Sequence, residues 1–210
     1  MSSANTAKIA STRSSTNTDA APRERILTSA LDLFYRHGIH AVGVDAIAEA
    51  AATNKMTLYR HFDSKDELVA ECLRRLAAET DALWEENARA HAGDPRGQLL
   101  GWVRDLGAWK LDLAERGCGF LNAAAELPDK RHPARRVVEE FKSRFRERFI
   151  ALCREARLSE PELLADEIFL LCEGARVSMQ SVGREGPAKR LPEMLQHLIA
   201  NHYQASVADG

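Results

Sequence analysis

Cationic and hydroxyl side chains gather in one short stretch of this chain, and their types suit contact with a polyanion. Between Ala50 and Phe62 no Asp or Glu occurs, and the donors are Lys55, Thr57, Tyr59, Arg60 and His61. Such side chains donate hydrogen bonds to phosphate oxygens, and some also reach base edges in a DNA groove. The chemistry that this stretch favours is recognition of DNA rather than catalysis.

The apolar spacing around this stretch predicts two short helices joined by a turn. Apolar residues of the first helix follow steps of three, one and three, at Val44, Ile47, Ala48 and Ala51. Leu58 and Phe62, four residues apart, give the second helix its buried face. Asn54 in the turn is a good N-cap for a helix that begins at Lys55. A short helix held by a partner helix, with cations pointing outward, fits a DNA major groove.

Flanking signals divide the chain into three parts. Residues 1–20 are rich in Ser, Thr, Asn and Ala without apolar periodicity, so we expect a disordered tail. Pro22 suits the first turn of a helix, and Gly38 suits its end. The capping box from Ser64 to Glu67 opens a long helix. We therefore expect a helix-turn-helix domain over residues 21–67 and a second helical domain over residues 68–205.

The remaining chain also follows a helical period, and it contains neither an internal repeat nor an alternating run long enough for a sheet. These patterns predict an all-α fold of about nine helices, three of them in the N-terminal domain. GxSxG, GxGxxG, HExxH and phosphate-binding loop motifs are absent from the sequence, which argues against an enzyme and against a catalytic site.

Composition limits the kind of DNA binding that is possible. The net charge is −2, so the molecule is not a polycation and any DNA contact must come from local placement of charge. The four cysteines lack zinc-type spacing, so we expect reduced thiols, no metal and no cofactor. The sequence shows no apolar run typical of a signal peptide or a membrane span, which predicts a cytoplasmic protein.

The segment from Thr57 to Leu68, TLYRHFDSKDEL, preceded by Ile47–Ala51, IAEAA, resembles the DNA-binding signature of TetR-family transcriptional regulators. The resemblance covers about residues 23–70 in order and without gaps. It implies a homodimeric repressor that places one helix-turn-helix on each half of a palindromic operator. It also implies a C-terminal domain with a dimer interface and a pocket for a small-molecule effector, which releases the repressor by moving the helix that starts at Ser64.

The turn and two further positions depart from the family pattern. The family usually has Gly, an apolar residue and Ser where this chain has Ala52, Thr53 and Asn54. Alanine is acceptable at position 52 if the backbone there is helical, and it costs energy if φ is positive. Met56 replaces a common Gly, and Gly43 replaces a frequent Thr or Ser. Tyr59 and Lys65 match phosphate contacts of the family. The full set of expected DNA contacts is Thr53, Asn54, Lys55, Met56, Thr57, Tyr59, Arg60, His61 and Lys65.

Candidates for the other two expected sites lie in the second domain. For the effector they are Trp102, Trp109, Phe120, Asn122, Glu126, Phe145 and Met179, with core packing as the alternative for the aromatic residues and Met179. Asn122 and Glu126 share one helical face, which either lines the pocket or meets solvent. Small residues beside apolar ones predict a dimer interface in the form of a four-helix bundle, with packing inside the subunit as the alternative. The candidate residues are Leu171, Gly174, Ala175, Ser178, Leu195 and Leu198.

Three further alternatives stay open. Cys118, between two glycines at a helix start, is either a reactive thiol or a small buried side chain. The altered turn also allows a helical interaction or sensor module of the same fold without sequence-specific DNA binding. Activation and repression are both compatible with the fold.

Overall fold

The computed structural model describes residues 20–109, 117–183 and 185–204. Within these ranges the chain forms nine α-helices, one 3-10 helix and no strand, so the all-α prediction is confirmed. The elements are α2 (Pro22–His37), α3 (Val44–Ala50), α4 (Lys55–His61), α5 (Lys65–Ala90), α6 (Pro95–Trp109), α7 (Gly119–Glu126), α8 (Pro133–Glu155), α9 (Pro161–Val182), η1 (Pro187–Arg190) and α10 (Leu191–Gln204). Residues 1–19 of the expected tail and the side chain of Trp109 lie outside the described part.

The chain divides into two compact units. The described residues up to Ala78, together with Cys118–Glu139, form the head unit. Those of Glu79–Gly117 and from Glu140 onward form the second unit. Helix α7 therefore belongs with the predicted DNA-binding helices, although it begins 58 residues after the end of α4. None of the helices described is long and apolar enough to cross a bilayer.

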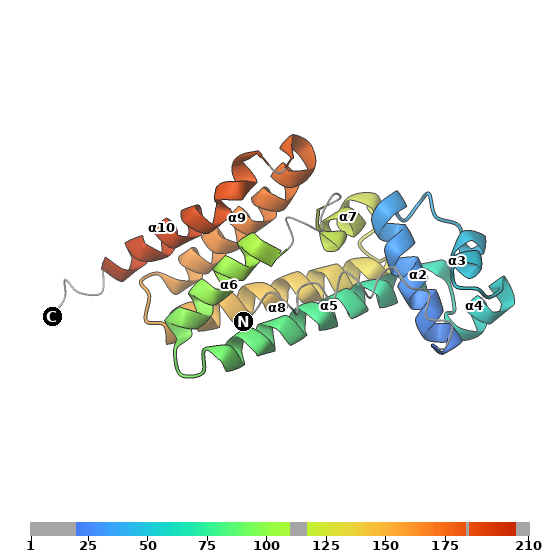
Figure 1. The fold of residues 1–210 in the computed structure, drawn as a ribbon, viewed down its shortest axis with the longest axis horizontal. Helices are drawn as coiled ribbons and strands as arrows, with labels where there is room; N and C mark the ends of the chain where they lie inside the picture. Colours follow the sequence, from blue (N-terminus) through green and yellow to red (C-terminus); the bar gives the residue numbers. More distant parts are fainter. Residues whose placement is uncertain (1–19, 110–116, 184, 205–210) are drawn as a thin grey trace. The chain divides into compact units, whose positions relative to one another are not determined.

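The head unit is built around the apolar face of α2. Pro22 occupies the start of this helix, and Gly38 ends it with φ 89° and an amide that donates to the Phe34 carbonyl at 3.0 Å. Helices α3 and α4 lie beside α2 (Figure 1). Their inward side chains meet those of α2 in one core, whose buried members include Ile26, Leu27, Ala30, Phe34, Ile47, Leu58 and Phe62. This core fixes which face of α4 points outward.

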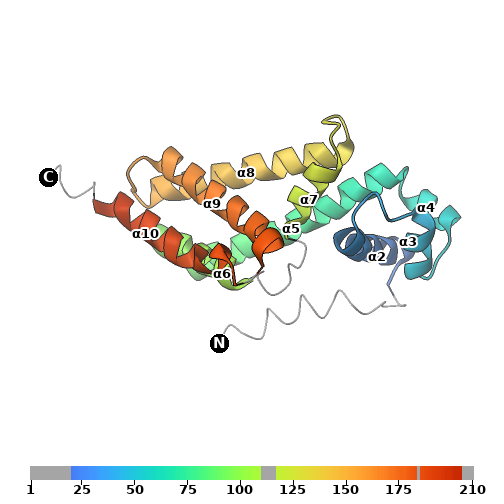
Figure 2. The same ribbon diagram turned by 90° about the horizontal axis from the view of Figure 1, so that it is seen from above.

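Aromatic side chains form the centre of the second unit. The ring centroids of Trp84 and Trp102 are 4.9 Å apart, and those of Trp84 and Phe149 are 5.4 Å apart in a T-shaped pair. The ring centroid of Phe145 lies 5.8 Å from that of Trp102 and 5.0 Å from that of Phe149. Helices α5, α6 and α8 therefore share one core. Helix α10 packs along both α9 and α6 (Figures 1 and 2).

Candidate nucleic-acid interface

The turn between α3 and α4 closes by a Schellman motif. The Thr53 amide donates to the Ala48 carbonyl at 2.9 Å, and the Ala52 amide donates to the Glu49 carbonyl at 3.0 Å. Ala52 has φ 47°, the left-handed conformation that favours glycine. Of the two conformations considered for Ala52, the structure therefore has the one that costs an alanine energy.

Arg25 of α2 holds this turn from the side. Its Nε donates to the Ala51 carbonyl at 3.0 Å, and its Nη2 donates to the Ala52 carbonyl at 3.3 Å. Its Nη1 also donates to the Ala20 carbonyl at 2.9 Å. The planar guanidinium thus satisfies carbonyl groups that the end of α3 leaves free. Sequence reasoning missed Arg25, because a single arginine on a polar helix face carries no local signal.

Helix α4 begins and is oriented as predicted. The Asn54 side chain accepts a hydrogen bond from the Thr57 amide at 2.9 Å, which confirms the N-cap. Leu58 is fully buried and Phe62 is nearly so, which turns the opposite face toward solvent. The exposed members of the predicted contact set are Asn54, Lys55, Met56, Tyr59, Arg60 and His61, whereas Thr53 and Thr57 are half-buried.

The outward face of α4 keeps its positive charge. Lys55 Nζ lies 3.6 Å from Asp45 of α3, a surface pair whose side chains are both more than half exposed. Such a pair is weak enough to exchange for a phosphate. The exposed cations and hydroxyls of α4 are therefore available to a polyanion.

Lys65, by contrast, turns toward the protein. Its ammonium donates to the Ile39 carbonyl at 2.6 Å and lies 5.9 Å from the centre of the Phe34 ring. The side chain is half-buried at the start of α5, where the Ser64 hydroxyl accepts a hydrogen bond from the Glu67 amide at 3.0 Å. An ammonium group has three donors, so Lys65 can bond the Ile39 carbonyl of the α2–α3 loop and still donate to a phosphate. The phosphate contact stays a prediction.

Glu126 at the end of α7 binds the same loop. Its Oε2 accepts hydrogen bonds from the Ile39 amide at 2.6 Å and the His40 amide at 3.3 Å. The His40 ring contacts the Glu126 carbonyl at 2.8 Å, and a Cβ added at Gly38 would lie 3.1 Å from the carboxylate. The sequence predicts that Glu126 either lines an effector pocket or meets solvent. In the structure its carboxylate instead binds backbone amides of the α2–α3 loop. It joins α7 to the loop that precedes α3.

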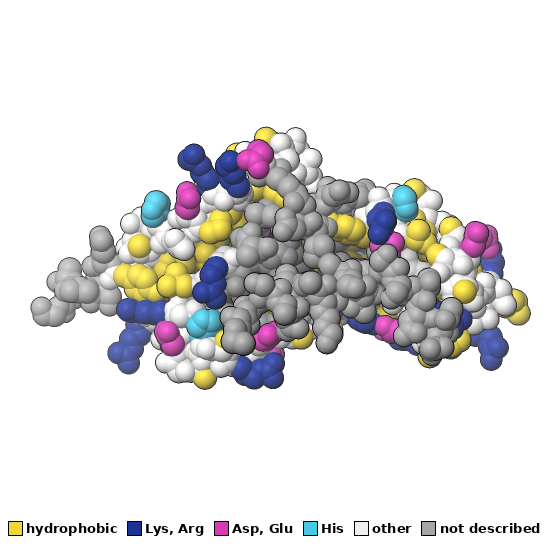
Figure 3. Space-filling model, viewed as in Figure 1, with side chains coloured by type: hydrophobic (Ala, Val, Ile, Leu, Met, Phe, Trp, Pro, Cys, Tyr) yellow, Lys and Arg dark blue, Asp and Glu magenta, His cyan; other side chains and the backbone are white. Residues whose placement is uncertain are grey.

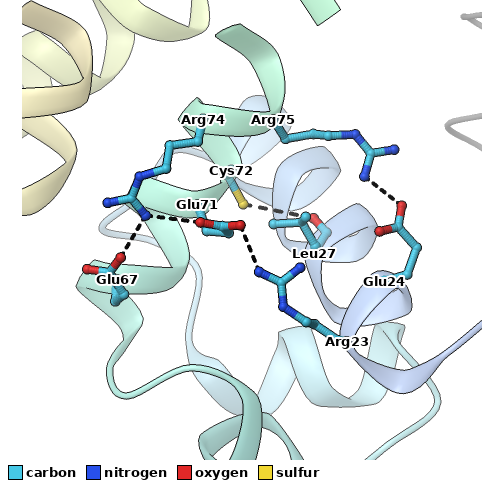
Figure 4. Close-up of polar contacts among 8 residues, drawn as sticks. All are labelled: Arg23, Glu24, Leu27, Glu67, Glu71, Cys72, Arg74 and Arg75. Atoms are coloured by element: carbon cyan, nitrogen blue, oxygen red, sulfur yellow. Dashed lines mark hydrogen bonds and ion pairs between the residues drawn. The ribbon is translucent and has the colours of Figure 1, made fainter. Parts of the chain in front are cut away.

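Ion pairs join α2 to the first turns of α5 (Figure 4). Arg23 lies 2.7 Å from Glu71, and Arg75 lies 2.6 Å from Glu24. Glu71 also receives Arg74 at 3.0 Å. The hydrogen bond from Arg23 and then that from Arg74 hold the pKa of the Glu71 carboxyl below its ordinary value, although partial burial acts in the opposite direction. The network links the first helix of the head to the helix that the family resemblance implicates in effector release.

The predicted effector residues are divided between the two units. Phe120, Asn122 and Glu126 belong to the head unit, whereas Trp102, Phe145 and Met179 belong to the second unit. Trp102 and Phe145 are in contact and buried in the aromatic core, and Met179 is also buried. Phe120 is buried and Asn122 is half-buried on α7. Core packing, the alternative to an effector pocket, describes the surroundings of Trp102, Phe120, Phe145 and Met179.

The surface of α9 shows an apolar stripe that sequence reasoning only partly found. Gly174 is exposed, and Leu171, Ala175, Ser178 and Leu198 are half-buried, but Leu195 has no exposed surface within its own chain. Large apolar side chains with 42–67% exposure also occur at Leu163, Leu170, Val177 and Val182 of α9 and at Met194 of α10. In the face shown by Figure 3, hydrophobic side chains gather where Figure 1 places α9 and α10.

The four cysteines are free thiols. Burial raises the pKa of the Cys172 thiol to about 11 and that of Cys153 to about 12, and it raises the pKa of Cys72 as well. These three thiols are therefore unreactive at neutral pH. Cys118 is half-buried at the N-terminal end of α7.

Comparison with known proteins agrees with this geometry. The pattern described as "Bacterial regulatory proteins, tetR family" matches residues 26–72. A protein described as a TetR transcriptional regulator from Streptomyces avermitilis is 30% identical, with 88% of this chain and 99% of that chain covered and a TM-score of 0.73. A TetR-family transcriptional regulator from Streptomyces coelicolor is 28% identical, with 88% and 95% covered and a TM-score of 0.76.

Curated relatives give the same class. The regulator YjdC of Escherichia coli is 24% identical over 152 residues, which cover 72% of this chain and 80% of YjdC. The transcriptional activator FasR of Mycolicibacterium smegmatis is 43% identical over 53 residues, a match that spans only 25% of this chain and 24% of FasR. The matched proteins are transcriptional regulators, which are not enzymes.

Fold and interface together define a helix-turn-helix DNA-binding protein. The predicted recognition helix is α4, which α3 and α2 support through their common core. The chain belongs to the TetR family of transcriptional regulators. Its function is the regulation of transcription through DNA binding.

Proposed function

We propose that this protein is a ligand-responsive repressor that binds a palindromic operator as a homodimer. The observation that carries the proposal is the outward face of α4, where exposed Lys55, Tyr59, Arg60 and His61 stand without a carboxylate of their own helix. Side chains of this kind both bind phosphates and read the major groove. The proposed contact set is the one predicted from the sequence, with Lys65 acting from its position at the Ile39 carbonyl.

The proposed dimer forms through α9 and α10. Leu163, Leu170, Gly174 and Val177 follow steps of seven, four and three, so they line one face of α9. A partner helix would cover this stripe, and Gly174 allows a close approach. Two helices from each subunit would make a four-helix bundle. In this arrangement Leu195 supports the interface from the core of its own subunit.

The proposed effector response passes through α7. Asn122 and Glu126 are four residues apart on this helix, and the Glu126 carboxylate binds the loop before α3. A ligand that contacts the first turns of α7 would therefore shift the Ile39 and His40 amides together with α3. Helix α7 would be the allosteric element, because a ligand would contact its first turns while Glu126 at its end binds the loop before α3.

DNA binding is the first test. A labelled fragment from the region upstream of the protein's own coding sequence is titrated at several salt concentrations, in parallel with random DNA. Tight binding that weakens steeply with salt supports an operator contact, because phosphate neutralisation releases counterions. Changing Tyr59→Phe with Arg60→Ala should reduce affinity and flatten the salt slope, whereas Arg190→Ala, an exposed arginine of η1, should not.

The alternative is an interaction or sensor module without sequence-specific binding. It predicts equal affinity for the upstream fragment, for sequences enriched from a random pool and for random DNA, with a folded dimer shown in parallel. The direction of regulation is decided by a reporter gene behind the operator. Loss of the protein raises expression if it represses and lowers expression if it activates.

A further inference from the structure

The rotation of α4 is set by its two buried side chains. Leu58 is fully buried and Phe62 is 4% exposed, so both point into the head core. Successive residues of an α-helix are rotated by about 100°. Met56 and Arg60, each two residues from Leu58, therefore lie on the side of α4 opposite to the core. They are also four residues apart, so they are neighbours on one ridge.

Met56 is an unusual occupant of this ridge. Its exposed fraction, 77%, is the highest among the large apolar residues of the described chain. Its neighbours do not cover it, because the Asn54 side chain is engaged with the Thr57 amide and Lys55 is directed toward Asp45. An exposed thioether gains from burial against another apolar group. The apolar group that a major groove offers is the C5-methyl of thymine.

Arg60 adds a second contact on the same ridge. Arginine donates two hydrogen bonds to N7 and O6 of guanine, the commonest specific contact in the major groove. Four residues of helix span about 6 Å, which is close to two base-pair steps at about 3.4 Å each. A helix lying in the groove thus brings Met56 and Arg60 to bases about two pairs apart.

We infer that Met56 contacts a thymine methyl in each half-site of the operator and that Arg60 reads a guanine about two base pairs away. The inference rests on the proposed function, because it names the bases that the same helix would read. It makes Met56 a residue that determines sequence specificity rather than one that adds affinity for any DNA. Phosphate contacts by neighbouring side chains would carry no such sequence information.

The test uses the full-length protein and an operator selected from random duplexes. Each thymine is replaced in turn by deoxyuridine, which lacks only the C5-methyl, and each guanine by 7-deazaguanine, which lacks only the N7 acceptor. Affinities are measured by fluorescence anisotropy for the unchanged protein, Met56→Ala, Met56→Leu and Arg60→Ala. Circular dichroism verifies that each variant is folded, which is expected because both changed side chains are exposed.

For the unchanged protein, one deoxyuridine position in each half-site should weaken binding about fourfold, the effect of one lost methyl contact. Met56→Ala should be insensitive at that position, and Met56→Leu should remain sensitive. One 7-deazaguanine position nearby should weaken binding about fivefold or more, and Arg60→Ala should be insensitive there.

Equal deoxyuridine sensitivity in the unchanged protein and Met56→Ala would overturn the inference while leaving operator binding in place. Failure of the unchanged protein to prefer any selected duplex over random DNA would overturn both the inference and the proposed function. The two failures are thus distinguishable in one set of titrations.

Discussion

Replacing Ala52 by glycine should stabilise the helix-turn-helix. An alanine in the left-handed conformation, as Ala52 is with φ 47°, is disfavoured by about 1–2 kcal/mol. Glycine escapes this cost, but it loses more backbone entropy on folding, about 0.5–1 kcal/mol. The Ala52 side chain is exposed, so its removal creates no cavity. The expected gain is the difference, about 0.5–1 kcal/mol.

Native-state hydrogen exchange measures this gain in stability at the turn itself. The tryptophans at positions 84, 102 and 109 all lie outside the head unit, so their fluorescence would not report on the turn. The Thr53 amide, bonded to the Ala48 carbonyl, should instead exchange about twofold to fivefold more slowly in Ala52→Gly.

The matched control is Ala46→Gly, an exposed alanine within α3. Glycine in a helix interior is destabilising, so exchange in the head should become faster by a comparable factor. If Ala52→Gly accelerated exchange as Ala46→Gly does, the positive φ at position 52 would cost alanine no more energy than it costs glycine. That result would refute the reasoning.

Four further perturbations test other contacts. Glu126→Ala should weaken protection of the Ile39 amide by about 1–3 kcal/mol in hydrogen exchange, because a half-buried donor loses its acceptor. Arg25→Ala should destabilise the head by about 1–3 kcal/mol in denaturant titrations followed by circular dichroism, and Arg25→Lys should restore little of this loss. Gly101→Ala should lower the melting temperature, because the new Cβ would lie 2.6 Å from the His91 ring, at a cost of about 1–3 kcal/mol. The lowered pKa of Glu71 contributes stability that is complete above its ordinary pKa and is lost as pH falls through the folded-state value, so Glu71→Gln should show a smaller loss of stability in acid.

The predicted recognition helix α4 and the local contacts that fix its ends and buried face were predictable from the sequence alone. The N-cap at Asn54, the buried Leu58 and the capping box at Ser64 are local patterns, set within one or two helical turns. Helical periodicity depends on neighbours three and four residues away, so it indicated an all-α chain before any long-range contact was known. The family signature lies in the same local stretch.

Tertiary structure alone decided how that helix is held and connected. The sequence left two backbone conformations open for Ala52, and the structure shows the one with positive φ. Arg25 reaches the turn across 26 residues, and Glu126 reaches Ile39 across 87. The inward turn of Lys65 and the complete burial of Leu195 likewise depend on partners distant in sequence. Local periodicity specifies which face of a helix is apolar, but it does not specify which distant backbone group a polar side chain will meet.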